Sequence, residues 1–207
     1  MSGILIAVEG IDGSGKSTIA GYIARRLEEQ GIPCVLLKEP SESVYGKRLR
    51  EMKWLLSAED ELELFTRDRE IDVRERILPA LRDGRVVIMD RYYLSSIAYQ
   101  GARGIDPEMI RERNESFAPK PDLVLLLDLP VDAAMERIRK RKSSANPFEN
   151  EKLLEKVREL FLKYADEKTV VIDAERPLEL VLKDVEEAVM NVVSARYIHK
   201  CSHGSLT

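Results

Sequence analysis

The residues best suited to chemistry form the run GIDGSGKS, which extends from Gly10 to Ser17. Its spacing, G-x-x-x-x-G-K-[ST], is typical of a loop whose glycines let backbone N–H groups point at phosphate oxygens with no Cβ atom in the way. Lys16 would reach the β- and γ-phosphates of a nucleotide, and the Ser17 hydroxyl would be a ligand of Mg²⁺. The alternative is a chance glycine-rich turn. The apolar run before the loop and the helix-period pattern after it favour the phosphate loop.

This loop predicts binding of ATP but does not identify the reaction, because ATPases, GTPases and kinases all use it. The helix that begins at the loop adds its positive N-terminal end to the site. The residues expected to contact ATP are Gly10, Ile11, Asp12, Gly13, Ser14, Gly15, Lys16, Ser17 and Thr18.

A second candidate pair, Asp90 and Arg91, ends the apolar run VVIMD and begins the segment after it. The carboxyl end of a parallel strand faces the crevice where α/β sheets bind ligands. There Asp90 could hold Mg²⁺ through water, and Arg91 could neutralise charge between donor and acceptor phosphates. An Asp-Arg ion pair on the surface is the alternative.

Five short apolar runs must position these residues, and each is too apolar to alternate between a buried and an exposed face. Such runs are typical of parallel strands that helices cover on both faces. They are Gly3–Val8, Cys34–Leu37, Val86–Met89, Leu123–Leu127 and Thr169–Ile172. Helical spacing of apolar residues between and after them is clearest in Ile19, Ile23 and Leu27, and in Val181, Val185, Val189 and Val192. We predict an α/β fold: one domain over residues 1–198, with a five-stranded parallel sheet and helices on both faces, and a polar tail over 199–207.

The composition argues against several other classes of protein. The net charge of −4 gives no general attraction to nucleic acid or to an anionic membrane, so we expect neither as a partner. Cys34 and Cys201 are the only cysteines, which argues against a disulfide framework and for a reducing compartment. No apolar stretch approaches the ~20 residues of a membrane span, and no signal peptide is recognisable at the start. We expect a cytoplasmic protein.

Five segments together resemble the thymidylate kinase family, in its order and approximate spacing, from about Ile4 to Val181. They are EGIDGSGKST, ELFTRDR, DRYYLSSIAYQG, PDLVLLLD and FE at 148–149. The resemblance implies a P-loop NTPase fold with a small helical lid at about 137–150. It also implies ATP as phosphoryl donor, Mg²⁺ as cofactor, dTMP as acceptor and a homodimer.

The resemblance further implies roles on the acceptor side. Asp12 would accept a hydrogen bond from the sugar 3′-hydroxyl, Phe65 would stack on thymine, and Arg69 would grip the 5′-phosphate, together with Arg91. Phe65 and Arg69 would share a helix face, since they are four residues apart. The alternatives are a turn role for Asp12 and core packing for Phe65. The positions expected to read or pack beside the base are Ser96, Tyr99 and Gln100.

The basic run ERIRKRK, from Glu136 to Lys142, resembles the stem of that family's mobile lid. The resemblance implies that Arg137 and Arg141, with Arg139 as a further candidate, contact the transferring phosphates, and that Arg141 also stacks on adenine. Phe148 would lie beside the sugar, and the backbone of the loop Asp173–Pro177 would line the adenine pocket. The alternative is a helix end whose cations complement its dipole. The catalytic residues are thus expected to be Lys16, Asp90, Arg91, Arg137 and Arg141.

The chain departs from the family pattern at three places. Pro147 replaces a basic residue, and Glu39-Pro40-Ser41-Glu42 replaces the usual acid-Pro-Gly-Gly. Gly13 stands where some members carry an arginine, so the catalytic cation should come from the lid. We expect a Gly13→Arg change to supply that cation when the lid arginines are neutralised.

Three other functions remain open from the sequence. A deoxynucleoside kinase shares the phosphate loop and a Glu-Pro like Glu39-Pro40, but it needs a general base. Another pyrimidine monophosphate kinase would use the same site. A non-catalytic nucleotide-binding regulator would need neither Asp90-Arg91 nor the cations of the lid.

Overall fold

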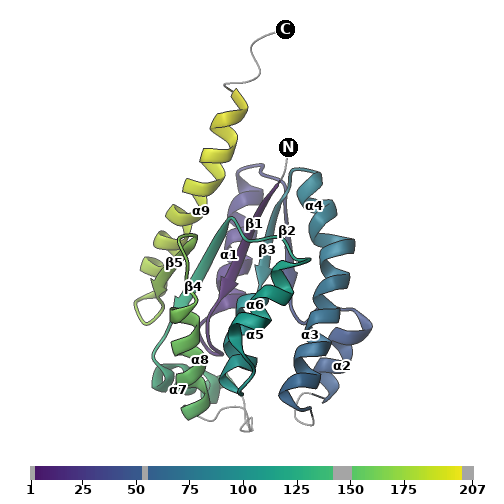
Figure 1. Ribbon diagram of the computed structural model, residues 1–207. Helices are drawn as coiled ribbons and strands as arrows, with labels where there is room; N and C mark the ends of the chain where they lie inside the picture. The colour runs from purple at the N-terminus through teal and green to yellow at the C-terminus, as the bar shows by residue number, and fades with distance from the viewer. Residues whose placement is uncertain (1–2, 53–55, 142–150, 202–207) are drawn as a thin grey trace.

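The computed structural model describes residues 3–52, 56–141 and 151–201, and these form an α/β sandwich around one parallel sheet (Figure 1). The five strands of the sheet are arranged in the order β2-β3-β1-β4-β5. Their bounds are Ile4–Glu9 for β1, Cys34–Lys38 for β2, Val86–Asp90 for β3, Leu123–Asp128 for β4 and Thr169–Asp173 for β5. The predicted α/β class and five parallel strands are confirmed.

Helices cover both faces of the sheet. They are α1 (Lys16–Glu29), α2 (Val44–Met52), α3 (Ala58–Asp72), the π-helical turn η1 (Val73–Ile77), α4 (Leu78–Arg82), α5 (Tyr93–Ala102), α6 (Pro107–Glu115), α7 (Val131–Arg141), α8 (Glu151–Lys163) and α9 (Leu178–Cys201). Helices α1 and α9 pack together on one face, whereas α3, α5 and α8 lie side by side on the other (Figure 1). Helix α9 includes the first three residues of the predicted polar tail. Within the described residues no helix combines the length and apolarity of a membrane span.

The sheet differs from the expectation at its two edges. The three central strands are almost wholly buried, as predicted. The edge strands β2 and β5 are not covered on both faces: Leu36 is 42% exposed and Val171 is 48% exposed. An apolar run does not distinguish a central strand from an edge strand, because both can be rich in β-branched and aliphatic residues.

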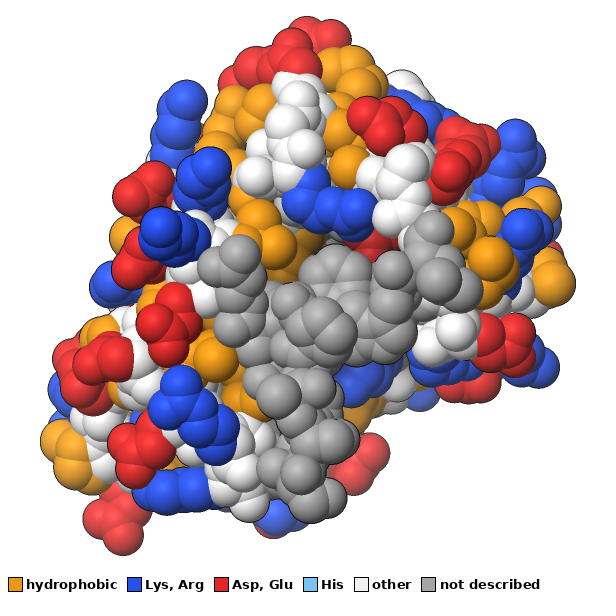
Figure 2. All heavy atoms as spheres, turned by 90° about the horizontal axis from the view of Figure 1, so that it is seen from below, with side chains coloured by type: hydrophobic (Ala, Val, Ile, Leu, Met, Phe, Trp, Pro, Cys, Tyr) orange, Lys and Arg blue, Asp and Glu red, His pale blue; other side chains and the backbone are white. Residues whose placement is uncertain are grey.

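Every strand continues past its apolar run and ends on a charged residue. The five terminal residues are Glu9, Lys38, Asp90, Asp128 and Asp173. Because the strands are parallel, these side chains gather at one end of the sheet, next to the loops that follow the strands. Figure 2 views the molecule from that end, where acidic and basic side chains are interspersed over the described surface.

Candidate active site

The phosphate loop connects β1 to α1 in a conformation that requires glycine. Gly10 and Gly13 have φ of 139° and 86°, a region that side chains other than glycine rarely adopt. A Cβ at Gly10 would lie 2.5 Å from the Leu127 carbonyl oxygen. One at Gly13 would lie 2.7 Å from the Ala134 carbonyl oxygen, in α7. The expectation that arginine at position 13 could replace the lid cations is therefore wrong, because the α7 backbone occupies the space.

Lys16 lies across this loop and is 6% exposed. Its Nζ donates to the Ile11 carbonyl oxygen at 2.8 Å. Burial lowers the pKa of Lys16 to about 7, and repulsion from Arg91 adds to this effect. A phosphate dianion bound in the loop would favour the charged ammonium. Lys16 is thus placed to become a full cation when a nucleotide binds.

The two predicted metal ligands lie next to each other. The Ser17 hydroxyl donates to Asp90 Oδ2 at 2.5 Å, and Asp90 is 4% exposed. A hydroxyl and a carboxylate are oxygen donors of the kind that Mg²⁺ prefers, and the remaining positions of Mg²⁺ are usually filled by phosphate oxygens and water. The described residues contain no cluster of three or more His, Cys, Asp or Glu side chains that could hold a metal alone. The donor set therefore fits Mg²⁺ bound together with a nucleotide.

Lys38 is a residue of this site that the sequence reasoning missed. It pairs directly with Asp90 in the register of β2 and β3. Its Nζ lies 3.2 Å from Asp90 Oδ2 and 3.4 Å from Ser17 Oγ. In the sequence, only its position at the end of an apolar run could have indicated Lys38 as a site residue. Its pairing with Asp90 depends on the register of β2 with β3, which the sequence does not show.

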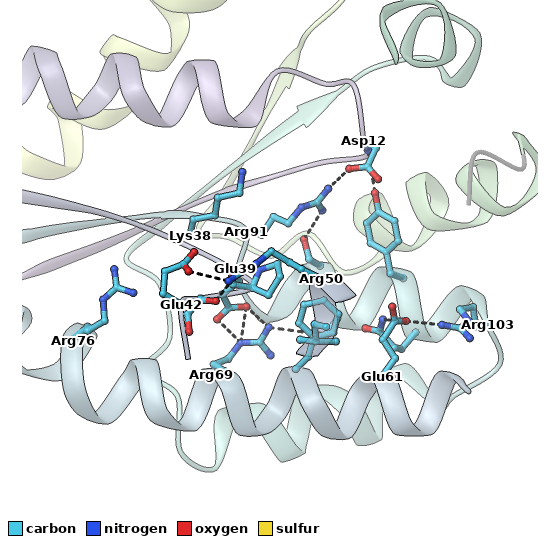
Figure 3. A pocket seen from close by; sticks show the side chains of 18 of the residues that line it. Asp12, Lys38, Glu39, Glu42, Arg50, Glu61, Arg69, Arg76, Arg91 and Arg103 are labelled. Carbon is cyan, nitrogen blue, oxygen red and sulfur yellow. Dashed lines mark hydrogen bonds and ion pairs between the residues drawn. The ribbon is translucent and has the colours of Figure 1, made fainter. Parts of the chain in front are cut away.

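A cavity of about 430 Å³ opens beside the phosphate loop. Figure 3 shows Asp12 and Arg91 on one side of it and the helix α3, with Glu61 and Arg69, on the opposite side. The residues predicted on the acceptor side that line this cavity are Asp12, Phe65, Arg69, Arg91, Ser96, Tyr99 and Gln100. The structure thus brings them together from three separate segments of the chain. Phe148 lies outside the described residues.

Arg91 joins the cavity to the phosphate loop. Its guanidinium pairs with the Asp12 carboxylate, donates to Ser95 Oγ at 3.2 Å, and lies 5.2 Å from the centre of the Tyr99 ring. The Tyr99 hydroxyl oxygen accepts from the Asp12 N–H at 3.0 Å. Burial raises the pKa of Tyr99, so its hydroxyl stays neutral. The arrangement places a cation where the cavity meets the phosphate loop.

Arg69, which was expected to bind the 5′-phosphate, is paired with a carboxylate of the protein itself. It is 1% exposed, and its Nε donates to both carboxylate oxygens of Glu39, at 2.8 and 3.0 Å. It also donates to Asn114 and to Ser96 Oγ. Burial raises the pKa of Glu39 to about 7, against the opposing charge of Arg69. The guanidinium is thus already paired with a carboxylate before any acceptor phosphate binds.

The loop that replaces acid-Pro-Gly-Gly is anchored by Asp68, a second residue that the sequence reasoning missed. Asp68 is fully buried and accepts from the Ser41 N–H at 2.7 Å, from Ser41 Oγ at 2.5 Å and from Ser43 Oγ at 2.6 Å. Two serines therefore fasten this wall of the cavity through a carboxylate on α3.

Gln100 presents an open acceptor. It is 2% exposed, and its Nε2 donates to Glu61 at 2.9 Å. Its Oε1 has no hydrogen-bond partner within the described residues. A buried amide oxygen without a partner costs free energy, so this atom is suited to a ligand N–H.

The predicted lid is described only in part. Arg137 Nη2 donates to the Ala174 carbonyl oxygen at 2.9 Å, in the loop predicted to line the adenine pocket. Arg139 pairs with Glu151 at the start of α8. The side chain of Arg141 lies outside the described part of the chain, as do residues 142–150. The structure thus places Arg137 against the loop after β5.

Comparison with known proteins agrees with this geometry. The family model described as Thymidylate kinase matches residues 8–185. A probable thymidylate kinase of Archaeoglobus fulgidus is 55% identical over 93% of this chain and 98% of its own. Thymidylate kinases of Akkermansia muciniphila and Xanthomonas campestris are 46% and 43% identical, over 90% and 94% of this chain and 91% and 86% of their own. The chain belongs to the thymidylate kinase family.

Proposed function

We propose that the protein transfers the γ-phosphoryl group of ATP to dTMP, giving ADP and dTDP. The observation that carries this proposal is the position of Arg91. This residue lines the acceptor cavity and is paired with Asp12 of the phosphate loop. A ligand in the cavity would therefore have one end within reach of a nucleotide bound at that loop. Transfer between two phosphates needs such a shared cation, because negative charge accumulates between them.

On the donor side, Lys16 and the loop N–H groups would bind the β- and γ-phosphates of ATP. Ser17 and Asp90 would hold Mg²⁺, which neutralises phosphate charge when it is bound. No side chain has to act as a strong base, because the acceptor oxygen belongs to a phosphate dianion. The chain's contribution is to align the two phosphates and neutralise their charge.

On the acceptor side, we assign the 5′-phosphate to Arg91 and Lys38 instead of Arg69. Both residues contact the donor site: Arg91 pairs with Asp12, and Lys38 contacts Ser17 and Asp90. Arg69 rises from the opposite wall of the cavity and is already paired with Glu39 (Figure 3). In-line transfer requires the acceptor phosphate to lie near the donor, so the Arg69 end suits the base.

The base end of the cavity suits a pyrimidine. Phe65 supplies an aromatic face for stacking, and Gln100 Oε1 can accept from a ring N–H such as thymine N3. Ser96 lies beside them, with its hydroxyl fixed by Arg69. Asp12 is the candidate acceptor for the sugar 3′-hydroxyl. Arg141 over adenine and Phe148 beside the sugar stay predictions from the resemblance.

A homodimer and a cytoplasmic location are also part of the proposal. Both are supported by the family resemblance, and the location also by the low cysteine content. Sedimentation equilibrium of the purified protein tests the dimer.

The test of the proposed function is an ADP-release assay with dTMP, dUMP, CMP, UMP and thymidine as acceptors. We expect the highest kcat/KM with dTMP and no turnover with thymidine. A preference for thymidine would indicate a deoxynucleoside kinase, although both oxygens of Glu39 are bound to Arg69 and neither is free to act as a base. Binding of ATP without phosphorylation of any acceptor would indicate a regulator.

A further inference from the structure

Glu9 is a buried acid that neither the phosphate loop nor the acceptor cavity uses. It is the last residue of β1, is 0% exposed and does not line the cavity. Its carboxylate oxygens accept three hydrogen bonds: Oε1 from the N–H groups of Tyr92 and Ser95, at 2.8 and 3.2 Å, and Oε2 from the Ser95 hydroxyl, at 2.5 Å. All three donors belong to the turn that follows Arg91.

The positions of these donors define the local role of Glu9. Tyr92 is the N-cap residue of α5, and its own side chain makes no capping hydrogen bond. In a capping box, side chains of the helix itself satisfy the N–H groups of the N-cap residue and of the third helical residue, which here is Ser95. Here Glu9 accepts hydrogen bonds from both N–H groups, although it belongs to β1 and not to the helix. The positive N-terminal end of the helix favours its negatively charged carboxylate.

The turn that Glu9 holds contains a strained Arg91. Arg91 has φ of 76°, and it is the only non-glycine residue with a positive φ in the part of the chain that the structure describes. A side chain in this region strains the backbone and persists only where the surroundings hold it. Ser95 Oγ, which donates to Glu9, accepts from the Arg91 guanidinium at 3.2 Å. One carboxylate thus restrains both the backbone and, through Ser95, the side chain of Arg91.

We infer that Glu9 is a positioning residue for catalysis, which caps α5 from β1 and thereby aims Arg91 at the phosphates. This inference rests on the proposed function, in which Arg91 binds the acceptor phosphate. Burial raises the pKa of Glu9, whereas the hydrogen bond from Ser95 and the charge of Arg91 lower it. The same contacts that order the turn therefore also favour the ionised carboxylate.

The first experiment is a double-mutant cycle of Glu9→Gln and Arg91→Met, measured by steady-state kinetics. Glutamine keeps the shape but places an NH₂ group where a carboxylate oxygen accepted a hydrogen bond. We expect Glu9→Gln to lower kcat/KM for dTMP by about 10- to 100-fold and to leave the KM for ATP within about twofold. In the Arg91→Met background the same change should have less than about a twofold effect. Equal losses in both backgrounds would overturn the inference.

A second variant and a matched control separate positioning from loss of fold. Ser95→Ala removes the hydroxyl between Glu9 and Arg91 without touching the buried acid, and its smaller loss should also vanish in the Arg91→Met background. Asp122→Asn alters another acid that accepts a backbone N–H, from Leu5, far from the site along β1. It should leave both KM values unchanged. If Asp122→Asn reproduced the kinetic pattern of Glu9→Gln, the effect would be one of general stability.

A measurement without substrate keeps this inference separate from the proposed function. The Nε–H resonance of Arg91, assigned by its absence in Arg91→Met, should be sharp and dispersed in the wild-type protein because the guanidinium is held. In Glu9→Gln it should broaden or move toward the position of mobile arginines. An unchanged resonance would refute positioning by Glu9 even in an active kinase. A lost resonance in a protein that does not phosphorylate dTMP would refute only the proposed function.

Discussion

Gly13 of the phosphate loop lies directly against the backbone of Ala134 in α7, so that a Cβ at position 13 would be 2.7 Å from the Ala134 carbonyl oxygen. The stem of the predicted lid therefore packs on the phosphate loop with no space between them for a side chain. An arginine at position 13 and this placement of α7 exclude each other sterically. Because position 13 cannot carry an arginine next to α7, the contact supports the expectation that the catalytic cation comes from the lid.

The first prediction concerns this contact. Gly13→Ala should lower the free energy of unfolding by about 1–3 kcal/mol, because it adds both a backbone strain and a clash with α7. It should also raise the KM for ATP. The matched control is Gly21→Ala, inside α1, where a Cβ meets nothing within 4 Å. That change should stabilise the protein by about 0.5–1 kcal/mol in urea unfolding. If the two variants unfolded alike, Gly13 would not be in contact with α7 in solution.

A second prediction follows from the pKa of about 7 for Lys16. At about pH 8.5 the free enzyme holds Lys16 mostly neutral, and bound phosphates should return it to the ammonium form. ATP binding should therefore take up about one proton, seen by calorimetry in buffers of different ionisation enthalpy. Lys16→Met should abolish the uptake.

The same shift has a consequence for stability. The unfolded chain has an ordinary lysine pKa of 10.5, so between about pH 7 and 10.5 it binds more protons than the native state. The contribution of Lys16 should thus make the protein more stable as the pH rises through this window, and Lys16→Met should remove that slope. An unchanged slope would show that Lys16 keeps its ordinary pKa.

A third prediction concerns Lys38, whose ammonium lies 3.2 Å from Asp90. Lys38→Met should lower kcat/KM for dTMP by about tenfold, because a charge-assisted contact to the acceptor phosphate is lost. Without nucleotide, the variant should bind Mn²⁺ more tightly in electron paramagnetic resonance titrations, since a competing cation has been removed from Asp90. Lys47→Met, on α2, removes the same charge away from Asp90 and should change neither quantity.

A fourth prediction separates the two arginines assigned to the lid. Arg137 donates to the Ala174 carbonyl oxygen, so Arg137→Ala should raise the KM for ATP through the adenine loop and change kcat little. Arg141→Ala should lower kcat by about 10³-fold if its guanidinium meets the transferring phosphoryl group. Equal effects of the two changes on kcat would place both on the phosphates.

Contiguous features of the site could be predicted from the sequence alone. The phosphate loop is one run of residues between a strand and a helix, so its fold and chemistry follow from local spacing. Asp90 and Arg91 were predicted from their place after an apolar run, and the structure shows Asp90 bonded to Ser17 and Arg91 lining the cavity. Phe65 and Arg69 both line the cavity, as residues four apart on one helix face can, and their roles toward a ligand stay predictions.

The partners of these residues could not be predicted, because they come from distant segments. Glu39 contacts Arg69 across 30 residues of chain, and on that contact rests our proposal of a different role for Arg69. Lys38 reaches Asp90 only through the register of β2 with β3. Glu9 caps a helix that begins 84 residues later, on a different element, whereas caps recognised in a sequence are local. The role of a buried charged residue depends on its partners in the folded protein, and the periodicity of the sequence does not show those partners.

The central claim is that the cavity beside the phosphate loop binds a nucleoside monophosphate with its phosphate at Arg91. The most direct measurement is the difference in Kd between dTMP and thymidine, determined by calorimetry for the wild-type protein and for Arg91→Met. We predict that the wild type binds dTMP at least about 100-fold more tightly than thymidine. Arg91→Met should remove most of that difference while leaving the Kd of thymidine within about threefold. A difference that survives in Arg91→Met, or a wild type that binds the two ligands equally, would contradict the account.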